Sequence, residues 1–241
     1  MSEGFPYLGE NQRVAFPSPR EAGAEGLVAA GGNLSPGVLL SAYTQGIFPW
    51  YSDGEPILWW SPDPRFVLFP EELHIPRSLR RTLNRGRFSF TLDRAFDEVI
   101  AACSVAPRSG QAGTWITDDM IEGYVTLNTL GYAHSLEVWA EGKLAGGLYG
   151  VSLGGMFFGE SMFARVSDAS KAGFVTLVRV LSERGFDCVD CQMYTEHLDR
   201  FGARDMARDE FLELLAGSLK RPTLKGDWQA QLGDHPRFGA L

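Results

Sequence analysis

The chain has 241 residues, of which 44% are hydrophobic and 22% charged, as in a globular protein with one large domain or a core domain and a smaller partner. No apolar stretch reaches the roughly 20 residues that a membrane-spanning helix needs, and the N-terminus lacks the pattern of a secretory signal. The formal net charge of −8 argues against a protein that coats nucleic acid over a wide surface. We therefore expect a cytoplasmic monomer without membrane contact, in which any nucleic-acid contact is local.

The first part of the chain, residues 1–65, has the pattern of a small irregular subdomain. Ser35 and Pro36 are typical of a helix N-cap and a first helical residue, which predicts a short helix over 36–45. Tryptophans and prolines are frequent after this helix, and proline confines strands to edges and turns. We expect residues 1–65 to form a small α/β subdomain and residues 66–241 to form a larger domain.

After residue 65 the hydrophobic pattern alternates between strands and helices. Two-residue turns at Glu141-Gly142 and Gly154-Gly155 predict a meander of three antiparallel strands. A helix and a returning strand then complete the α+β plan of the N-acetyltransferase-like (GNAT-like) domains, a fold that does not by itself define a function. The polar stretch from about Arg221 predicts a tail packed loosely on the surface. The predicted strands are 66–69, 88–92, 133–140, 143–153, 156–163 and 188–193, and the predicted helices are 76–85, 94–103, 118–130, 169–183 and 208–216.

Three cysteines are too few for a disulfide framework, and an odd number is typical of a reducing compartment. Cys188 and Cys191 form a C-x-x-C pattern, which occurs in redox and zinc sites. A redox site places the first cysteine at a helix N-terminus, whereas this segment has the pattern of a strand. No second pair of cysteines or histidines at ligand spacing completes a tetrahedral zinc site. We therefore predict two half-buried strand cysteines, and neither a metal nor a cofactor.

A basic cluster of five arginines within eleven residues lies on and just after the helix predicted at 76–85. No acidic residue interrupts it. Such a run is as typical of a solvated helix face as of a phosphate-binding surface. Its members are Arg77, Arg80, Arg81, Arg85 and Arg87.

Two acidic residues and one amide are candidates for chemistry. Asp190 and Gln192 lie two apart on a predicted strand, so both side chains point to one face. The pair fits either a hydrogen-bonded core network or a site that holds an amine. Glu160 lies in an otherwise apolar strand, where a carboxylate is costly unless it is paired. It fits either a structural salt bridge or a site for a cationic amine.

Seven short motifs resemble, in order and spacing, those of the leucyl/phenylalanyl-tRNA-protein transferases. The resemblance runs from about Ala15 to Leu219. The motifs are Gly46–Trp50 (GIFPW), Leu58–Arg65 (LWWSPDPR), Gly113–Thr117 (GTWIT), His134–Trp139 (HSLEVW), Phe158–Phe163 (FGESMF), Ala169–Lys171 (ASK) and Asp190–Gln192 (DCQ).

This resemblance implies an enzyme that transfers Leu, Phe or Met from aminoacyl-tRNA to the N-terminal Arg or Lys of a protein and so marks that protein for N-degron proteolysis. It implies that Asp190 holds Gln192, that Gln192 accepts a hydrogen bond from the attacking α-amine, and that Glu160 binds a cationic amine. The ester is already reactive and an α-amine has a pKa of about 8, so positioning can suffice for the reaction. Whether Asp190 takes a proton or only orients its neighbour stays open.

The resemblance also implies where the substrates bind. Trp50 and Trp115 lie in predicted loops, where a tryptophan is commonly a packing residue. The resemblance implies instead that both lie where the terminal adenine of the tRNA stacks. The five arginines would then contact the acceptor-stem phosphates. An apolar pocket for the donor side chain is expected, and each of its candidates fits a plain core equally well. These candidates are Leu148, Phe157, Met162, Phe163 and Val175.

Two other functions remain possible for the same residues. An acyltransferase that uses a coenzyme thioester needs a glycine-rich pyrophosphate loop before the helix at 169–183, and this sequence has Asp168 there instead. A non-catalytic module that binds the tRNA end or an N-terminal residue would use the same acidic and amide groups. Tyr194, Thr195 and Glu196, which follow Gln192, leave the acceptor preference less defined.

Overall fold

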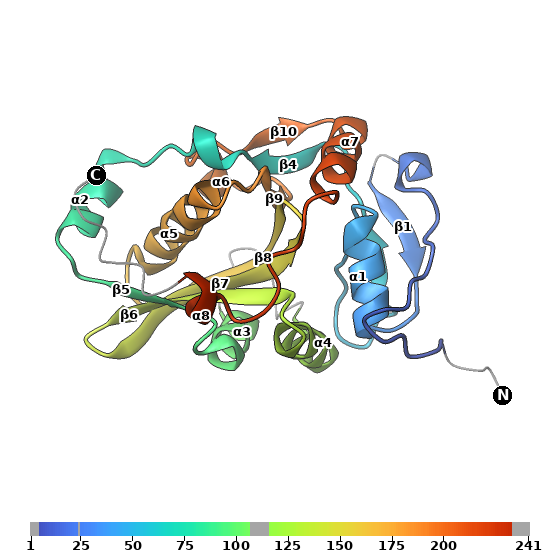
Figure 1. Ribbon diagram of the computed structural model, residues 1–241, viewed down its shortest axis with the longest axis horizontal. Helices are drawn as coiled ribbons and strands as arrows, with labels where there is room; N and C mark the ends of the chain where they lie inside the picture. The colour runs from blue at the N-terminus through green and yellow to red at the C-terminus, as the bar shows by residue number, and fades with distance from the viewer. Residues whose placement is uncertain (1–4, 24, 107–115, 233–241) are drawn as a thin grey trace.

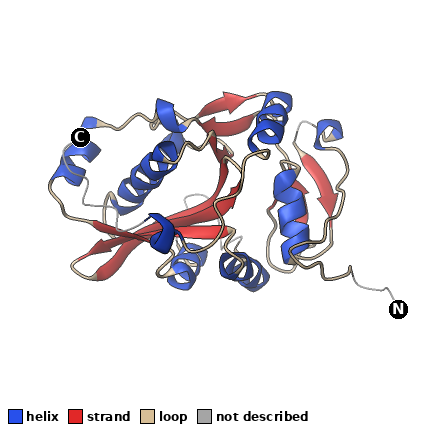
Figure 2. Ribbon diagram, in the orientation of Figure 1, coloured by secondary structure: helices blue, strands red, loops and turns tan. Residues whose placement is uncertain are grey.

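The computed structural model describes residues 5–23, 25–106 and 116–232. Within them the chain forms a three-stranded sheet in the order β1-β3-β2 and a seven-stranded sheet in the order β10-β4-β9-β8-β7-β6-β5, with helices on both faces of the larger sheet (Figures 1 and 2). The strands are β1 (Leu27–Ala30), β2 (Phe48–Pro49), β3 (Leu58–Trp60), β4 (Arg65–Leu68), β5 (Ser89–Leu92), β6 (Ala133–Ala140), β7 (Lys143–Leu153), β8 (Met156–Ala164), β9 (Cys188–Gln192) and β10 (Arg204–Met206). The helices are η1 (Pro19–Glu21), α1 (Pro36–Thr44), η2 (Pro70–Glu72), α2 (Arg77–Asn84), α3 (Phe96–Ser104), α4 (Asp118–Thr129), α5 (Ala169–Glu183), α6 (Glu196–Asp199), α7 (Arg208–Ser218) and α8 (Trp228–Leu232).

The meander of β6, β7 and β8 forms because the turns between its strands have the right chemistry. Glu141 and Gly142 both adopt positive φ, 52° and 74°, which matches the hairpin turns that follow the twist of the strands. Helix α5 then crosses the sheet, and β9 returns parallel to β8, with Met156 opposite Cys188. This order confirms the predicted α+β class and its plan of meander, helix and returning strand.

The predicted bounds are confirmed for β6, β7 and α5, and elsewhere they differ by one or two residues at an end. The prediction missed β10, a three-residue edge strand that pairs with β4. Its sequence Arg-Asp-Met has no hydrophobic alternation, so its strand structure comes only from pairing with its neighbour.

The core lies on both faces of the larger sheet. Neighbouring residues of β8 contribute to the core on alternate faces of the sheet, because successive side chains of a strand point to opposite faces. Phe158 packs with residues of α1, α3 and α4, whereas Phe157 packs with residues of α2 and α5. The first core continues into the N-terminal residues, and Trp59 of β3 is part of it.

For residues 221–232, the part of the predicted tail that the structure describes, the prediction of loose packing is wrong. Trp228 of α8 is fully buried, and its indole stacks on the His134 imidazole with 3.9 Å between the ring centroids. The Asp93 carboxylate accepts a hydrogen bond from the Trp228 backbone N–H at 2.8 Å. The same oxygen, Oδ2, lies 2.9 Å from His134 Nδ1. One aromatic side chain buries enough apolar area to anchor a polar segment, and average polarity does not reveal it.

The cysteines are free thiols. Cys188 is fully buried, which corrects the half-buried state predicted for it, while Cys191 is half-buried as expected. Within the described ranges, no group of three or more His, Cys, Asp or Glu residues is arranged to hold a metal ion. None of the described helices has both the length and the apolar character needed to cross a membrane.

Replacing Gly150 with Ala should destabilise the fold by about 1–3 kcal/mol, because an added Cβ overpacks the core. The new atom would lie 2.1 Å from the Phe158 carbonyl oxygen and 2.7 Å from the Phe157 ring. Urea unfolding measures the change. Gly217→Ala in α7 is the control, since nothing lies within 4 Å of its Cβ position and alanine favours helix. Equal unfolding midpoints for the two variants would contradict the prediction.

Candidate active site

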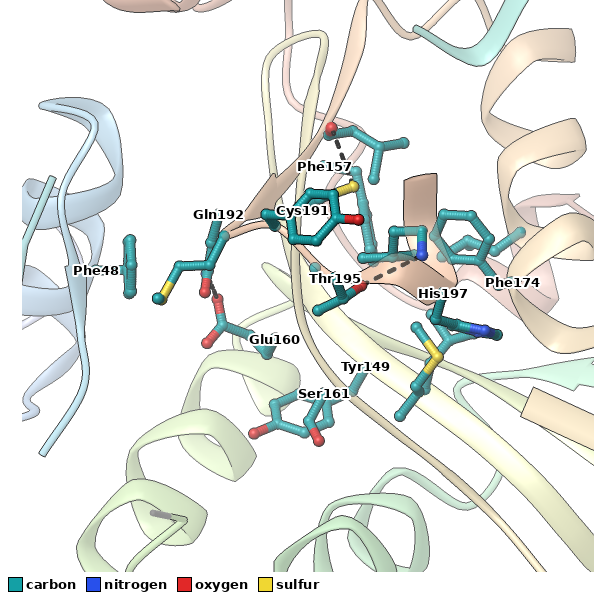
Figure 3. A pocket seen from close by; sticks show the side chains of 18 of the residues that line it. Phe48, Tyr149, Phe157, Glu160, Ser161, Phe174, Cys191, Gln192, Thr195 and His197 are labelled. Carbon is teal, nitrogen blue, oxygen red and sulfur yellow. Dashed lines mark hydrogen bonds between the residues drawn. The ribbon is translucent and has the colours of Figure 1, made fainter. Parts of the chain in front are cut away.

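A cavity of about 440 Å³ opens where β8 and β9 approach β2, α5 and α6 (Figure 3). Its volume is in the range of small-molecule sites, and most of its wall is apolar with a few polar groups, which is the usual composition of such sites. The polar groups include Glu160, Ser161, Gln192, Thr195 and His197, and the apolar wall includes Leu148, Phe157, Met162, Phe174, Leu177 and Leu198.

Glu160 of β8 is a buried carboxylate held by three neutral donors. Gln192 Nε2 and the Tyr43 hydroxyl donate to Oε1 at 2.9 and 2.7 Å, and the Tyr124 hydroxyl donates to Oε2 at 2.8 Å. Burial is the main cause that raises the pKa of Glu160 to about 7. Among the residues that the structure describes, no Lys, Arg or His forms an ion pair with Glu160, so the salt-bridge interpretation has no support.

The two tyrosines come from different parts of the chain. Tyr43 lies on α1 and Tyr124 on α4, both are fully buried, and their hydroxyls also contact each other. Burial, followed by the charge of Glu160, raises both pKa values well above 10, so the hydroxyls stay protonated and can donate. The sequence analysis missed both, because a tyrosine on the apolar face of a helix has the pattern of an ordinary core residue.

Asp190 of β9 forms a fully buried ion pair with Arg65 of β4. Arg65 Nε lies 2.8 Å from Oδ1, and Nη2 lies 2.6 Å from Oδ2. The guanidinium is stacked between the rings of Phe48 and Phe211, 4.7 and 4.6 Å from their centroids. The paired carboxylate is absent from the cavity wall. Arg65 ends the LWWSPDPR motif, but nothing in the sequence indicated its partner.

Gln192 is held through its backbone. Its N–H donates to Asp190 Oδ1 at 2.9 Å, so Asp190 holds the main chain of Gln192, while Glu160 holds its side-chain amide. Gln192 has a φ of 64°, which is unfavourable for a residue with a side chain. Such strain persists where the surroundings enforce it, often at functional sites. With Nε2 donating to Glu160, Oε1 is the atom of this amide that can accept from a substrate.

Three of the predicted pocket residues line the cavity: Leu148, Phe157 and Met162. Phe163 does not, because it follows Met162 on β8 and so packs into the core on the opposite face. Val175 is also core, and its neighbour Phe174 takes the place on the wall.

Of the two predicted tryptophans, Trp50 is half-buried and lines the cavity. Its ring is tilted against that of Trp60, whose indole N–H donates to the Trp50 carbonyl at 2.7 Å. Trp115 lies outside the described residues. Cys191 is also on the wall, and burial raises the pKa of its thiol above the usual value, which is opposite to the shift of a reactive redox cysteine.

The basic cluster lies away from the cavity wall, on and after α2. Leu79 and Leu83 bury one side of this helix against the core, and the opposite side carries the charge. Within the described part of the chain none of the five arginines forms an ion pair. All five are exposed: Arg77, Arg80, Arg81, Arg85 and Arg87.

Comparison with solved structures finds weak likenesses. L-PGS from Bacillus licheniformis aligns with a TM-score of 0.39 and 14% identity, over 68% of this chain and 58% of that one. A GCN5-related N-acetyltransferase from Kribbella flavida aligns with a TM-score of 0.35 and 9% identity, over 72% of this chain and 62% of that one.

Sequence comparison is far more specific. The family model of the leucyl/phenylalanyl-tRNA protein transferase matches residues 67–216, and that of its N-terminal domain matches residues 32–63. The leucyl/phenylalanyl-tRNA–protein transferase of Myxococcus xanthus is 57% identical over 92% of this chain and 94% of its own length. The protein of that name from Stutzerimonas stutzeri is 56% identical over 90% and 96%. The chain therefore belongs to the leucyl/phenylalanyl-tRNA-protein transferase family of aminoacyltransferases.

Proposed function

We propose that this chain joins Leu, Phe or Met, carried as an ester on tRNA, to the α-amine of a protein that begins with Arg or Lys, and so marks that protein for N-degron proteolysis. The observation that carries the proposal is a buried carboxylate, Glu160, that pairs with no cation among the described residues and is hydrogen-bonded to the Gln192 amide on the wall of an apolar cavity. A cationic or amine-bearing substrate supplies what this carboxylate lacks. The cytoplasm, where charged tRNA is made, is the proposed place of the reaction, with the chain acting as a monomer.

The donor aminoacyl group occupies the cavity. Its apolar side chain packs against Leu148, Phe157, Met162 and Phe174, and the flexible thioether of Met162 adapts to donors of different shape. The terminal adenine stacks on Trp50 at the edge of the cavity, a contact worth about 1–3 kcal/mol per base. The reactive ester then lies beside Gln192.

The acceptor amine attacks the ester carbonyl. A new C–N bond forms, the C–O bond to the ribose breaks, and the proton that the amine loses ends on the ribose oxygen. Gln192 Oε1 accepts a hydrogen bond from the attacking amine, and the Glu160 carboxylate stabilises the positive charge that develops on its nitrogen. Asp190 acts as a positioning residue, because both its oxygens are bound by Arg65 and one also holds the Gln192 backbone.

The basic cluster on α2 binds the phosphates of the acceptor stem. Its support is five exposed arginines that form no ion pair with any described residue, on a chain whose net charge of −8 restricts RNA contact to one local surface. We also propose that residues 1–65 and 66–241 are the two domains of the chain. The match to the N-terminal family model ends at residue 63 and the match to the second model begins at residue 67, which agrees with this division.

Labelled Leu-tRNA and peptides that differ only in an N-terminal Arg, Lys or Ala test the reaction. We expect transfer to Arg and Lys but not to Ala. Gln192→Ala should reduce transfer at least about tenfold while tRNA binding is retained, since it removes a transition-state contact. Absence of transfer to every peptide by the unmodified protein, with Leu-tRNA still bound, would instead indicate a binding module.

The pH dependence of transfer tests Glu160. The carboxyl has a pKa of about 7 and ionises above it, and the acceptor amine is neutral above about pH 8, so kcat/KM should rise from pH 6 to pH 8. In Glu160→Gln the rise near pH 7 should disappear and only the rise of the amine should remain. The control is Glu137→Gln, which alters a second buried carboxyl whose pKa burial also raises, away from the cavity wall. An unchanged profile in Glu160→Gln would refute the role.

Salt dependence tests the basic cluster. Every arginine that binds one phosphate contributes about 0.7–0.9 to the slope of log K against log salt, so Arg77→Ala with Arg81→Ala should lower that slope by about 1.5. The exposed Arg13 provides the control substitution, Arg13→Ala. Slopes that stay equal in all three proteins would place the tRNA-binding surface elsewhere.

A further inference from the structure

Two large hydrophobic side chains stand exposed at the edge of the cavity and take no part in the reaction described above. Met193 is 44% exposed and Tyr194 is 61% exposed, and both belong to the cavity wall. The other large hydrophobics exposed among the described residues are Phe5, Tyr7, Leu27 and Val105, none of which lies on this wall. Exposed apolar groups that adjoin a binding site are typical of a contact surface. We call Met193 and Tyr194 the rim.

The backbone holds the rim in place at both ends. On one side the Met193 N–H donates to the Cys191 carbonyl at 2.7 Å, in a tight turn whose central residue is the left-handed Gln192. On the other side Thr195 caps α6, with its hydroxyl accepting from the Leu198 N–H at 3.2 Å. The Tyr194 ring packs edge-on against Phe66, with 5.2 Å between the centroids. A surface ordered in this way loses little entropy when a partner binds.

The position of the rim relates it to the acceptor chain. If the acceptor amine meets Gln192, the second residue of that chain has its Cα about 3.8 Å from the first. Met193 and Tyr194 directly follow Gln192 in the chain and line the same cavity. Trp50, assigned to the terminal adenine, follows β2 and so comes from another part of the fold.

Charge distinguishes the acceptor chain from the tRNA as the occupant. Met193, Tyr194 and Thr195 carry no charge, and the neighbouring Glu196 is paired with Arg200. Among the described residues, the rim offers a phosphate no cation, because the exposed arginines of the basic cluster lie on and just after α2, outside the cavity wall. An apolar side chain can pack against the thioether of Met193 and the aromatic ring of Tyr194, which both make favourable apolar contacts.

We propose that the rim of Met193 and Tyr194 binds the side chain of the second residue of the acceptor protein and favours an aromatic or aliphatic residue there. The inference rests on the proposed transfer to an N-terminal amine and adds a determinant of acceptor choice. Glu160 and Gln192 bind the α-amine of the first residue, and the rim binds the side chain of the second.

The test measures transfer from Leu-tRNA to peptides that begin Arg-Phe, Arg-Ala or Arg-Asp. With the unmodified enzyme, kcat/KM should be about tenfold higher for Arg-Phe than for Arg-Ala, and lowest for Arg-Asp. Tyr194→Ala should remove most of this difference by raising KM for Arg-Phe, while the KM for Leu-tRNA and the preference for Arg over Ala at the first position stay unchanged. Tyr194→Phe should retain the preference, and Tyr7→Ala, which removes a tyrosine that is 70% exposed elsewhere, should behave as the unmodified enzyme.

Two results would overturn the inference while leaving the proposed function intact. One is equal transfer to the three peptides by the unmodified enzyme. The other is a Tyr194→Ala variant that keeps the preference and shows a raised KM for Leu-tRNA, which would mean that the rim stacks on the donor base. Absence of transfer to every Arg peptide would refute the proposed function and this inference together.

Discussion

The buried ion pair of Arg65 and Asp190 is the interaction on which the rest of this structure depends. Four elements meet at it, since Arg65 lies on β4, Asp190 on β9, and the stacking rings of Phe48 and Phe211 come from β2 and α7. Removing one partner of such a pair typically costs about 3–5 kcal/mol, because an unpaired charge is left in the interior. The pair therefore joins β2 of the N-terminal residues, two neighbouring strands of the larger sheet and the C-terminal helix α7.

That pairing also separates the two carboxylates of the site. Asp190 has a permanent cation in Arg65, whereas Glu160 is bound by neutral donors among the described residues. This difference is why we propose Glu160 as the carboxylate that meets a substrate amine. Two carboxylates in such different environments have different chemical properties and can therefore have different roles. Because Tyr43 belongs to α1, the N-terminal residues complete the site and are more than an attached module.

The charge distribution suits an acidic protein that handles a nucleic acid only by its end. The basic cluster on α2 stands outside the cavity wall, the cavity itself is mostly apolar, and the edge that follows Gln192 is uncharged. In the proposed function, electrostatic attraction acts at a distance from the reacting groups, while shape and hydrogen bonds act beside them. Phosphate contacts of this kind position a tRNA without selecting its sequence.

Much of the fold was predictable, because hairpin turns at Glu141-Gly142 and the periodicity of residues 133–183 depend on neighbours in the chain. The motifs likewise pointed to the family and to Glu160. A local pattern shows which face of an element a side chain occupies, but it does not show which distant side chain it contacts. Only the tertiary structure therefore revealed that Arg65 pairs with Asp190, 125 residues away, and that Tyr43 bonds to Glu160, 117 residues away. The same reason explains the buried tail, because Trp228 is anchored by His134 on a strand almost a hundred residues earlier. The sequence thus determined the elements and the candidate groups, and three-dimensional packing decided their partners.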